Sequence, residues 1–163
     1  MKARLTAREV ALVALRIEEN GLRFYERCAA ESTDPSATEL FTSLATEERA
    51  HHATFEAMAE QLDASETLGF PGEEELFVRA LADESMFPAR RTGELLPGGA
   101  APTATDVIDL ALKMEHDAIR FYEGLARLLP RSDSEKLHLI VEEERTHVTM
   151  LESVRAKLAE PTS

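Results

Sequence analysis

The chain has 163 residues, of which 44% are hydrophobic and 30% are charged, and its net charge at pH 7 is −13. This length suits one domain with a sizeable core, and the charge argues against a nucleic-acid partner because phosphates would be repelled. Cys28 is the only cysteine, which excludes an internal disulfide framework and a CxxC metal site.

The first half of the chain predicts two long helices. Thr6 followed by Glu9 has the spacing of a capping box, and apolar residues then recur at helical spacing to about Ala30. Asp34 and Pro35 predict the start of a second helix, with Asp34 as N-cap and Pro35 at the first helical position. This helix is expected to run to about Leu62.

The middle of the chain, residues 63–104, is interrupted by proline and glycine, and we expect a short helix from Glu73 to about Ser85 within it. A connection of this length is too long for a turn. It suits a crossover that leads from one end of a helix bundle to the other.

The last third of the chain predicts two more long helices. The third is expected to start at Thr103 or Thr105 and to end before Pro130. Ser132 with Glu135 has the spacing of another capping box, so the fourth helix is expected to start there and to continue to about Leu158. Short turns would make each successive helix pair antiparallel. The expected fold is therefore an all-α four-helix bundle in one domain, residues 1–163, with half-repeats at about 8–62 and 105–158.

The two halves repeat one pattern of polar residues. Each half has a glutamate seven residues before a tyrosine, Tyr25 or Tyr122, and a Glu-x-x-His motif further along. The first glutamate and the motif are 30 residues apart in the first half and 29 in the second. The candidate metal ligands are Glu18, Glu48, His51, Glu115, Glu144 and His147.

These glutamates differ from the other acids of the chain in their helical neighbours. Residues three, four and seven positions from each of them are mostly apolar, whereas the adjacent Glu19 and Glu142 have charged neighbours. Ionised carboxylates buried in a core cost several kcal/mol unless they are compensated. Protonation could compensate them, but two metal ions would do so better. In a Glu-x-x-His motif both donors share a helix face, and oxygen with imidazole nitrogen suits iron or manganese.

This pattern resembles the rubrerythrin branch of the ferritin-like superfamily, and specifically its members without a rubredoxin domain. The resemblance implies a ferritin-like fold and two iron ions, with manganese or zinc as alternatives. It also implies that Glu18 and Glu115 are the first carboxylates of two half-sites, that Glu48 and Glu144 bridge or chelate, and that His51 and His147 each bind one iron. Tyr25 and Tyr122 would match tyrosines whose hydroxyls bond to the ligand carboxylates.

The expected activity is the two-electron reduction of peroxide or dioxygen, as a peroxidase or a ferroxidase. Rubrerythrins have a further glutamate one turn after the position of Glu115, where this chain has Ala118. Asp117 could replace it only if the helix bulged locally. Because the sequence contains no CxxC pair, electrons would come from a separate donor, rubredoxin-like or other.

Two alternatives to an oxidoreductase remain open from the sequence: a non-catalytic module that binds or stores metal, and a metal-free scaffold. We expect a homo-oligomer, by default a dimer, and the long connection would allow two chains to exchange helices. The start of the sequence lacks an apolar signal segment, and there is no apolar stretch of about 18 residues, so we expect a cytoplasmic protein without a membrane partner.

Overall fold

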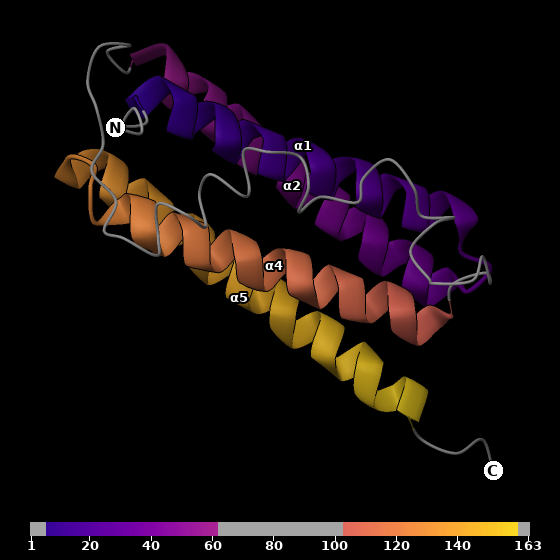
Figure 1. Ribbon diagram of the computed structural model, residues 1–163. Helices are drawn as coiled ribbons and strands as arrows, with labels where there is room; N and C mark the ends of the chain where they lie inside the picture. The colour runs from indigo at the N-terminus through magenta and orange to yellow at the C-terminus, as the bar shows by residue number, and fades with distance from the viewer. Residues whose placement is uncertain (1–5, 62–102, 160–163) are drawn as a thin grey trace, which may run out of the picture. The chain divides into compact units, whose positions relative to one another are not determined.

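The computed structural model describes residues 6–61 and 103–159, and the chain divides into two compact units, Met1–Ala89 and Arg90–Ser163. The long helices of the described residues are α1 (Ala7–Glu31), α2 (Pro35–Gln61), α4 (Ala104–Ala126) and α5 (Arg131–Ala159). Figure 1 shows α1 with α2 and α4 with α5 as the two helix pairs. The predicted short helix, residues 73–85, and the predicted crossover as far as residue 102 lie outside the described residues.

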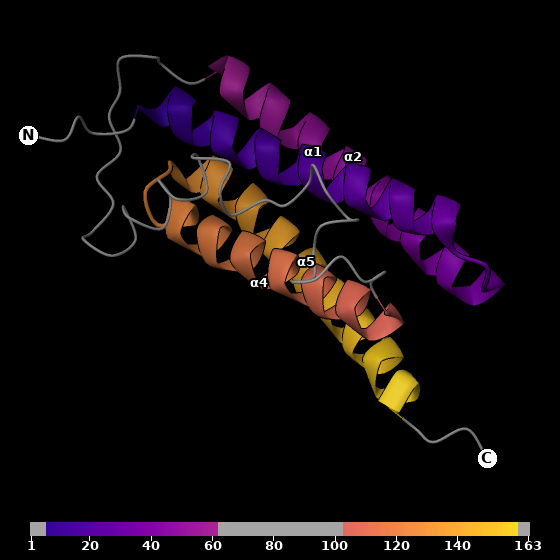
Figure 2. The ribbon, with the colours of Figure 1, turned by 45° about the vertical axis from the view of Figure 1, so that its right-hand side comes forward.

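The first unit contains an antiparallel pair, α1 and α2, joined by residues 32–34; a second view shows the same pairing (Figure 2). Its helix starts are the predicted ones. The Glu9 amide donates to the Thr6 hydroxyl at 3.1 Å, and the Thr6 amide donates to the Glu9 carboxylate at 2.7 Å. The Ala37 amide donates to Asp34 Oδ1 at 2.9 Å, so Asp34 caps α2.

The apolar residues that the sequence predicts for the inner side of α1 are buried. They include Val10, Val13, Ala14, Ile17 and Phe24. Across the pair, Tyr25 stacks on Phe41 with ring centroids 6.2 Å apart. At the surface, Arg49 of α2 pairs with Glu26 of α1 at 2.6 Å. Apolar burial supplies most of the stability of such a pair, because exposed ion pairs contribute little.

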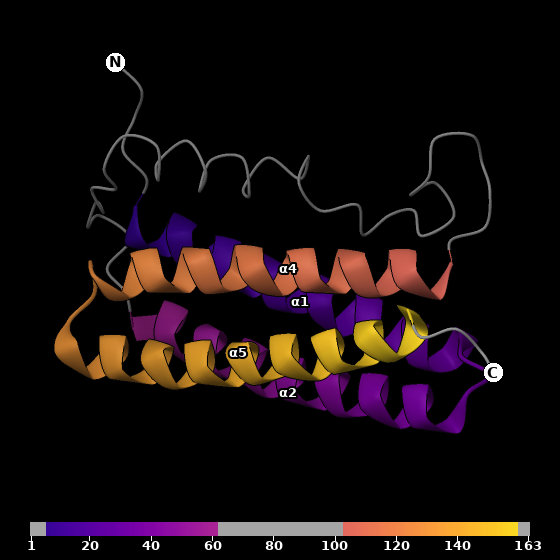
Figure 3. The same ribbon diagram turned by 90° about the horizontal axis from the view of Figure 1, so that it is seen from below.

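The second unit contains the antiparallel pair α4 and α5, which run side by side in Figure 3. Of the two predicted starts for α4, the structure selects Thr103, which forms a capping box with Asp106. The Thr103 hydroxyl donates to the Asp106 carboxylate at 2.6 Å, and this hydrogen bond lowers the pKa of Asp106. Arg145 of α5 pairs with Glu123 of α4 at 2.5 Å, at the positions equivalent to Arg49 and Glu26.

The predicted start of the fourth helix at Ser132 is wrong. The helix α5 begins at Arg131, so Ser132 lies within its first turn. The reason is that the Pro130 carbonyl accepts the first helical hydrogen bonds, from the amides of Asp133 at 3.0 Å and Ser134 at 2.9 Å. Glu135 instead pairs with Arg131 at 2.9 Å.

None of the described helices combines the length and the apolar character that crossing a bilayer demands.

Candidate metal centre

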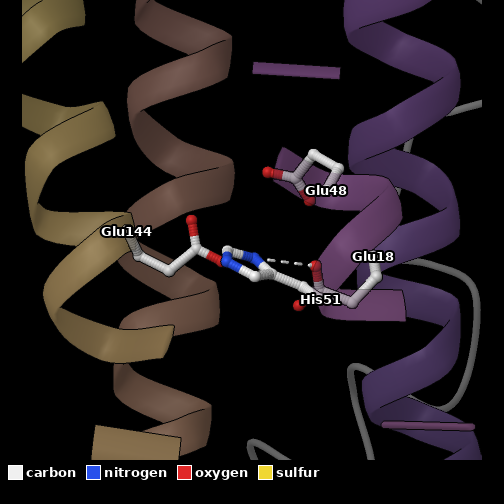
Figure 4. A group of neighbouring side chains, drawn as sticks. All are labelled: Glu18, Glu48, His51 and Glu144. Atoms are coloured by element: carbon white, nitrogen blue, oxygen red, sulfur yellow. Dashed lines mark ion pairs between the residues drawn. The ribbon is translucent and has the colours of Figure 1, made fainter. Parts of the chain in front are cut away.

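Three of the predicted ligands meet in the first helix pair. Glu18 lies on α1, and Glu48 and His51 lie on α2. Figure 4 shows these side chains turned toward one another, and the dashed line joins His51 Nδ1 to Glu18 Oε2, which are 3.4 Å apart. One donor atom from each of the three lies within 4.8 Å of the others. The exposed fraction of each residue is 4% or less.

The helix α2 brings Glu48 and His51 together because residues three apart share one face of a helix. That face is the apolar one, since it also carries the buried residues Phe41, Leu44 and Phe55. The prediction that Glu48 points into an apolar stripe is therefore confirmed.

Gly21 lies one turn after Glu18 on α1, beside the first half-site, which consists of Glu18, Glu48 and His51. A Cβ atom at Gly21 would lie 2.5 Å from Glu48 Oε2 and 2.9 Å from Glu48 Cδ, well inside van der Waals contact. The carboxylate of Glu48 therefore lies directly against the backbone of α1. The sequence showed a glycine on the same face as Glu18, but nothing in it indicated that a side chain of another helix fills the space.

The remaining three predicted ligands meet in the second helix pair. Glu115 lies on α4, and Glu144 and His147 lie on α5. His147 Nδ1 is 2.8 Å from Glu144 Oε2 and 3.6 Å from Glu115 Oε1. One donor atom from each residue lies within 4.8 Å of the others, and all three residues are buried. The sequence repeat thus brings the same three residue types together in each helix pair.

Burial and charge raise the proton affinity of the second half-site, which consists of Glu115, Glu144 and His147. Burial, and then the charge of the Glu144 carboxylate, raise the pKa of Glu115 to about 8. Burial alone would lower the pKa of His147, but hydrogen bonds and charge from Glu115 and Glu144 outweigh it and raise that pKa to about 11. Without a metal ion, this half-site therefore keeps protons at neutral pH, which a bound cation would displace.

The two tyrosines of the repeat are core residues. Tyr25 and Tyr122 are 1% and 0% exposed, and each packs edge-on against the preceding phenylalanine, with ring centroids 5.3 and 5.5 Å apart. Their positions are thus equivalent in the two helix pairs. The predicted bond from each hydroxyl to a ligand carboxylate stays a prediction.

Asp117 does not take the place of the missing glutamate in this structure. The helix α4 is α-helical throughout, and Asp117 pairs with Lys113 on the same helix at 2.5 Å. Ala118 instead occupies the buried face. Without a local bulge, the Asp117 side chain points away from the face that carries Glu115.

Several other polar residues near the motifs lie at the surface. Glu19, Glu142, His116 and His138 are exposed, and Glu19 pairs with Arg23 at 2.5 Å. Cys28 behaves as a small apolar residue, because burial raises the pKa of its thiol to about 12 and keeps it protonated.

Comparison with known proteins identifies the family of this arrangement. The sequence model of the rubrerythrin family matches residues 9–89. A crystal structure of a proposed ferritin-like diiron-carboxylate protein from Thermotoga maritima matches with a TM-score of 0.72 at 22% identity, covering 98% of this chain and 100% of that chain. The chain is a rubrerythrin-like protein of the ferritin-like fold. No curated protein matches its sequence.

The structural match to the Thermotoga maritima protein confirms the predicted fold class, an all-α four-helix bundle of the ferritin-like type. The rubrerythrin family match ends at residue 89, so it includes Glu18, Glu48 and His51 but none of the second set. For Glu115, Glu144 and His147 the support is the internal repeat and the geometry of the second helix pair. The predicted single-domain organisation stays a prediction for this rubrerythrin-like chain.

The donor chemistry of the rubrerythrin-like chain fits transition-metal ions. Each helix pair contributes two carboxylates and one imidazole, and neither set contains a thiolate. Hard oxygen and imidazole donors suit iron, manganese and zinc. In the first set, the space beside Gly21 lets a glutamate reach its position without distorting α1.

Proposed function

We propose that this protein is a diiron-type oxidoreductase that reduces peroxide or dioxygen by two electrons. Glu18, Glu48 and His51 would provide one set of iron ligands. The second set would be Glu115, Glu144 and His147. Manganese and zinc are the alternative ions that the same donors would accept.

One observation carries the proposal. Among the described residues, the buried acidic, basic and imidazole side chains are the six candidate ligands and no others. No buried lysine or arginine accompanies them in these ranges, so each helix pair buries two carboxylates with one imidazole. Burying charge in this way destabilises a protein unless protons or cations compensate it. Two polyvalent cations would compensate it in the functional protein.

The residues of the chain have distinct roles in this proposal. The helices hold the donor atoms close together before a metal ion arrives, which reduces the entropy lost on binding. Binding at the second set would release the protons held by Glu115 and His147. When bound, two ferrous ions would supply the two electrons that reduce the oxidant. A separate electron donor would then restore the ferrous state.

The test begins with anaerobic titration of the metal-free protein with ferrous iron. We expect binding to saturate at two irons per chain. Glu18→Ala and Glu115→Ala should each reduce the stoichiometry or weaken affinity at least tenfold, whereas the adjacent controls Glu19→Ala and His116→Ala should not. Many irons per chain would favour storage, and no binding would favour a metal-free scaffold.

A second measurement separates binding from redox chemistry. Peroxide or oxygenated buffer is mixed with the ferrous protein in a stopped-flow spectrometer. Formation of a near-ultraviolet oxo-bridge band, faster with peroxide, would support the peroxidase function; a faster reaction with dioxygen would support the ferroxidase function. If the wild-type protein binds two irons and no band forms with either oxidant, the redox proposal is wrong.

A further inference from the structure

Gly21 occupies an unusual position for a glycine. It lies in the interior of α1 and is buried, with no turn or helix end nearby. Glycine is less favourable than alanine in a helix interior, because it loses more backbone freedom on folding and contributes no side-chain packing. A glycine here therefore needs a reason outside its own helix.

The neighbouring helix supplies that reason. A Cβ atom at position 21 would lie 2.5 Å from Oε2, 2.9 Å from Cδ and 3.4 Å from Cγ of Glu48. All three contacts are with the outer part of one side chain, and no backbone atom is among them. An added methyl group would therefore displace the Glu48 carboxylate and leave the packing of the two helix backbones unchanged.

The repeat provides an internal comparison. Ala118 lies three residues after Glu115, as Gly21 lies three residues after Glu18. Ala118 is buried, so the second helix pair accommodates a methyl group at the equivalent position. There the glutamate of the Glu-x-x-His motif, Glu144, lies 2.8 Å from His147 Nδ1. The need for a glycine is thus specific to Glu48 and is not a general requirement of this helix pairing.

We propose that Gly21 is a positioning residue for metal binding, because it leaves the space that the Glu48 carboxylate occupies beside Glu18 and His51. This role rests on the proposed function, in which Glu48 is a metal ligand. It makes the two half-sites unequal, since only the first depends on a missing side chain. A substitution that improves the helix should therefore damage the site.

The test compares Gly21→Ala with the matched variant Ala118→Gly. The metal-free melting temperature is measured by circular dichroism in chelator, and affinity is measured by anaerobic titration with ferrous iron. We expect Gly21→Ala to melt at the same or a higher temperature than the wild type while its iron affinity in the first half-site falls about tenfold or more. Ala118→Gly should melt at a lower temperature and bind iron within about twofold of the wild type.

A double-mutant cycle assigns the effect to Glu48. In a Glu48→Ala background, Gly21→Ala should cause no further loss of affinity, because the displaced carboxylate is already absent. Equal losses in both backgrounds would overturn the proposal. So would a Gly21→Ala protein that binds iron as the wild type does, or one that melts well below the wild type without metal, since the glycine would then serve packing.

The same experiment distinguishes this inference from the proposed function. If the wild-type protein binds two irons and Gly21→Ala does so equally well, the positioning role is wrong and the metal function stands. If the wild-type protein binds no iron, both are wrong.

Discussion

The metal-free protein should lose stability as the pH rises through neutrality. The ordinary pKa of a glutamate is 4.5, and the folded protein raises the pKa of Glu115 to about 8. The ordinary pKa of a histidine is 6.5, and the folded protein raises the pKa of His147 to about 11. The folded state therefore binds more protons than the unfolded state between these values. The stability that these protons contribute is complete below the unfolded pKa values and is lost as pH rises toward the folded ones.

The expected magnitude follows from the number of protons involved. Each proton held only by the folded state changes the free energy of unfolding by about 1.4 kcal/mol per pH unit. Between pH 6.5 and 7.5, the unfolded chain has lost the Glu115 proton and is losing that of His147, while the folded chain keeps most of both. These two groups should thus lower the free energy of unfolding by about 2 kcal/mol over that interval.

The assay is urea denaturation in chelator at pH 6.5 and 7.5, followed by circular dichroism. Glu115→Gln removes one of the two titrating groups and also a partner that raises the pKa of His147, so it should reduce the pH dependence by at least half. His138→Gln removes an exposed histidine of the same helix as His147 and should leave it unchanged. The slope of free energy against urea should be equal at both pH values, which shows that the same transition is measured.

Iron affinity should have the opposite pH dependence, because a cation must displace these protons to bind. Titration with ferrous iron at the two pH values should give tighter binding at 7.5. A metal-free protein whose stability is flat or rises from pH 6.5 to 7.5 would refute the assignment of bound protons. Affinity independent of pH would refute it as well.

Three further predictions concern packing and the surface. Leu44→Ala, at a fully buried position of α2, should lower the free energy of unfolding by about 2–5 kcal/mol in urea denaturation; a loss below about 1 kcal/mol would contradict its place in the core. Arg49→Ala removes an exposed ion pair with Glu26 and should cost less than about 1 kcal/mol in the same assay, with iron stoichiometry unchanged. Tyr122→Phe keeps the ring packing with Phe121, so the metal-free melting temperature should change by only a few degrees. Iron affinity should fall if the Tyr122 hydroxyl orients a ligand, and unchanged affinity would exclude that role.

Local signals explain why the helix boundaries were mostly predictable. The starts at Thr6 and Asp34 depend on hydrogen bonds between residues three apart, which the sequence contains in full. The predicted start of α5 at Ser132 was wrong because the Pro130 carbonyl accepts the first helical hydrogen bonds. Every residue has a backbone carbonyl, so the sequence gives no signal for this kind of helix start. Spacing alone could not decide between them.

The candidate ligands were identifiable for a similar reason. Helical periodicity places Glu48 with His51 and Glu144 with His147 on apolar faces, whatever packs against those faces. Repetition of the pattern then distinguished these acids from exposed ones such as Glu19. The donor set was therefore fixed by the order of residues within each helix.

Contacts between helices required the tertiary structure. The space that Gly21 leaves for Glu48, and the shifted pKa values of Glu115 and His147, arise from atoms far apart in sequence that meet only when two helices pack. Asp117 is a different case, because it pairs with Lys113 on its own helix, and the structure was needed only to show that α4 stays regular there. The sequence by itself determined which side chains face inward, because that depends on helical period. Only folding decided how closely they approach, because that depends on which backbone lies opposite and whether it carries a side chain there.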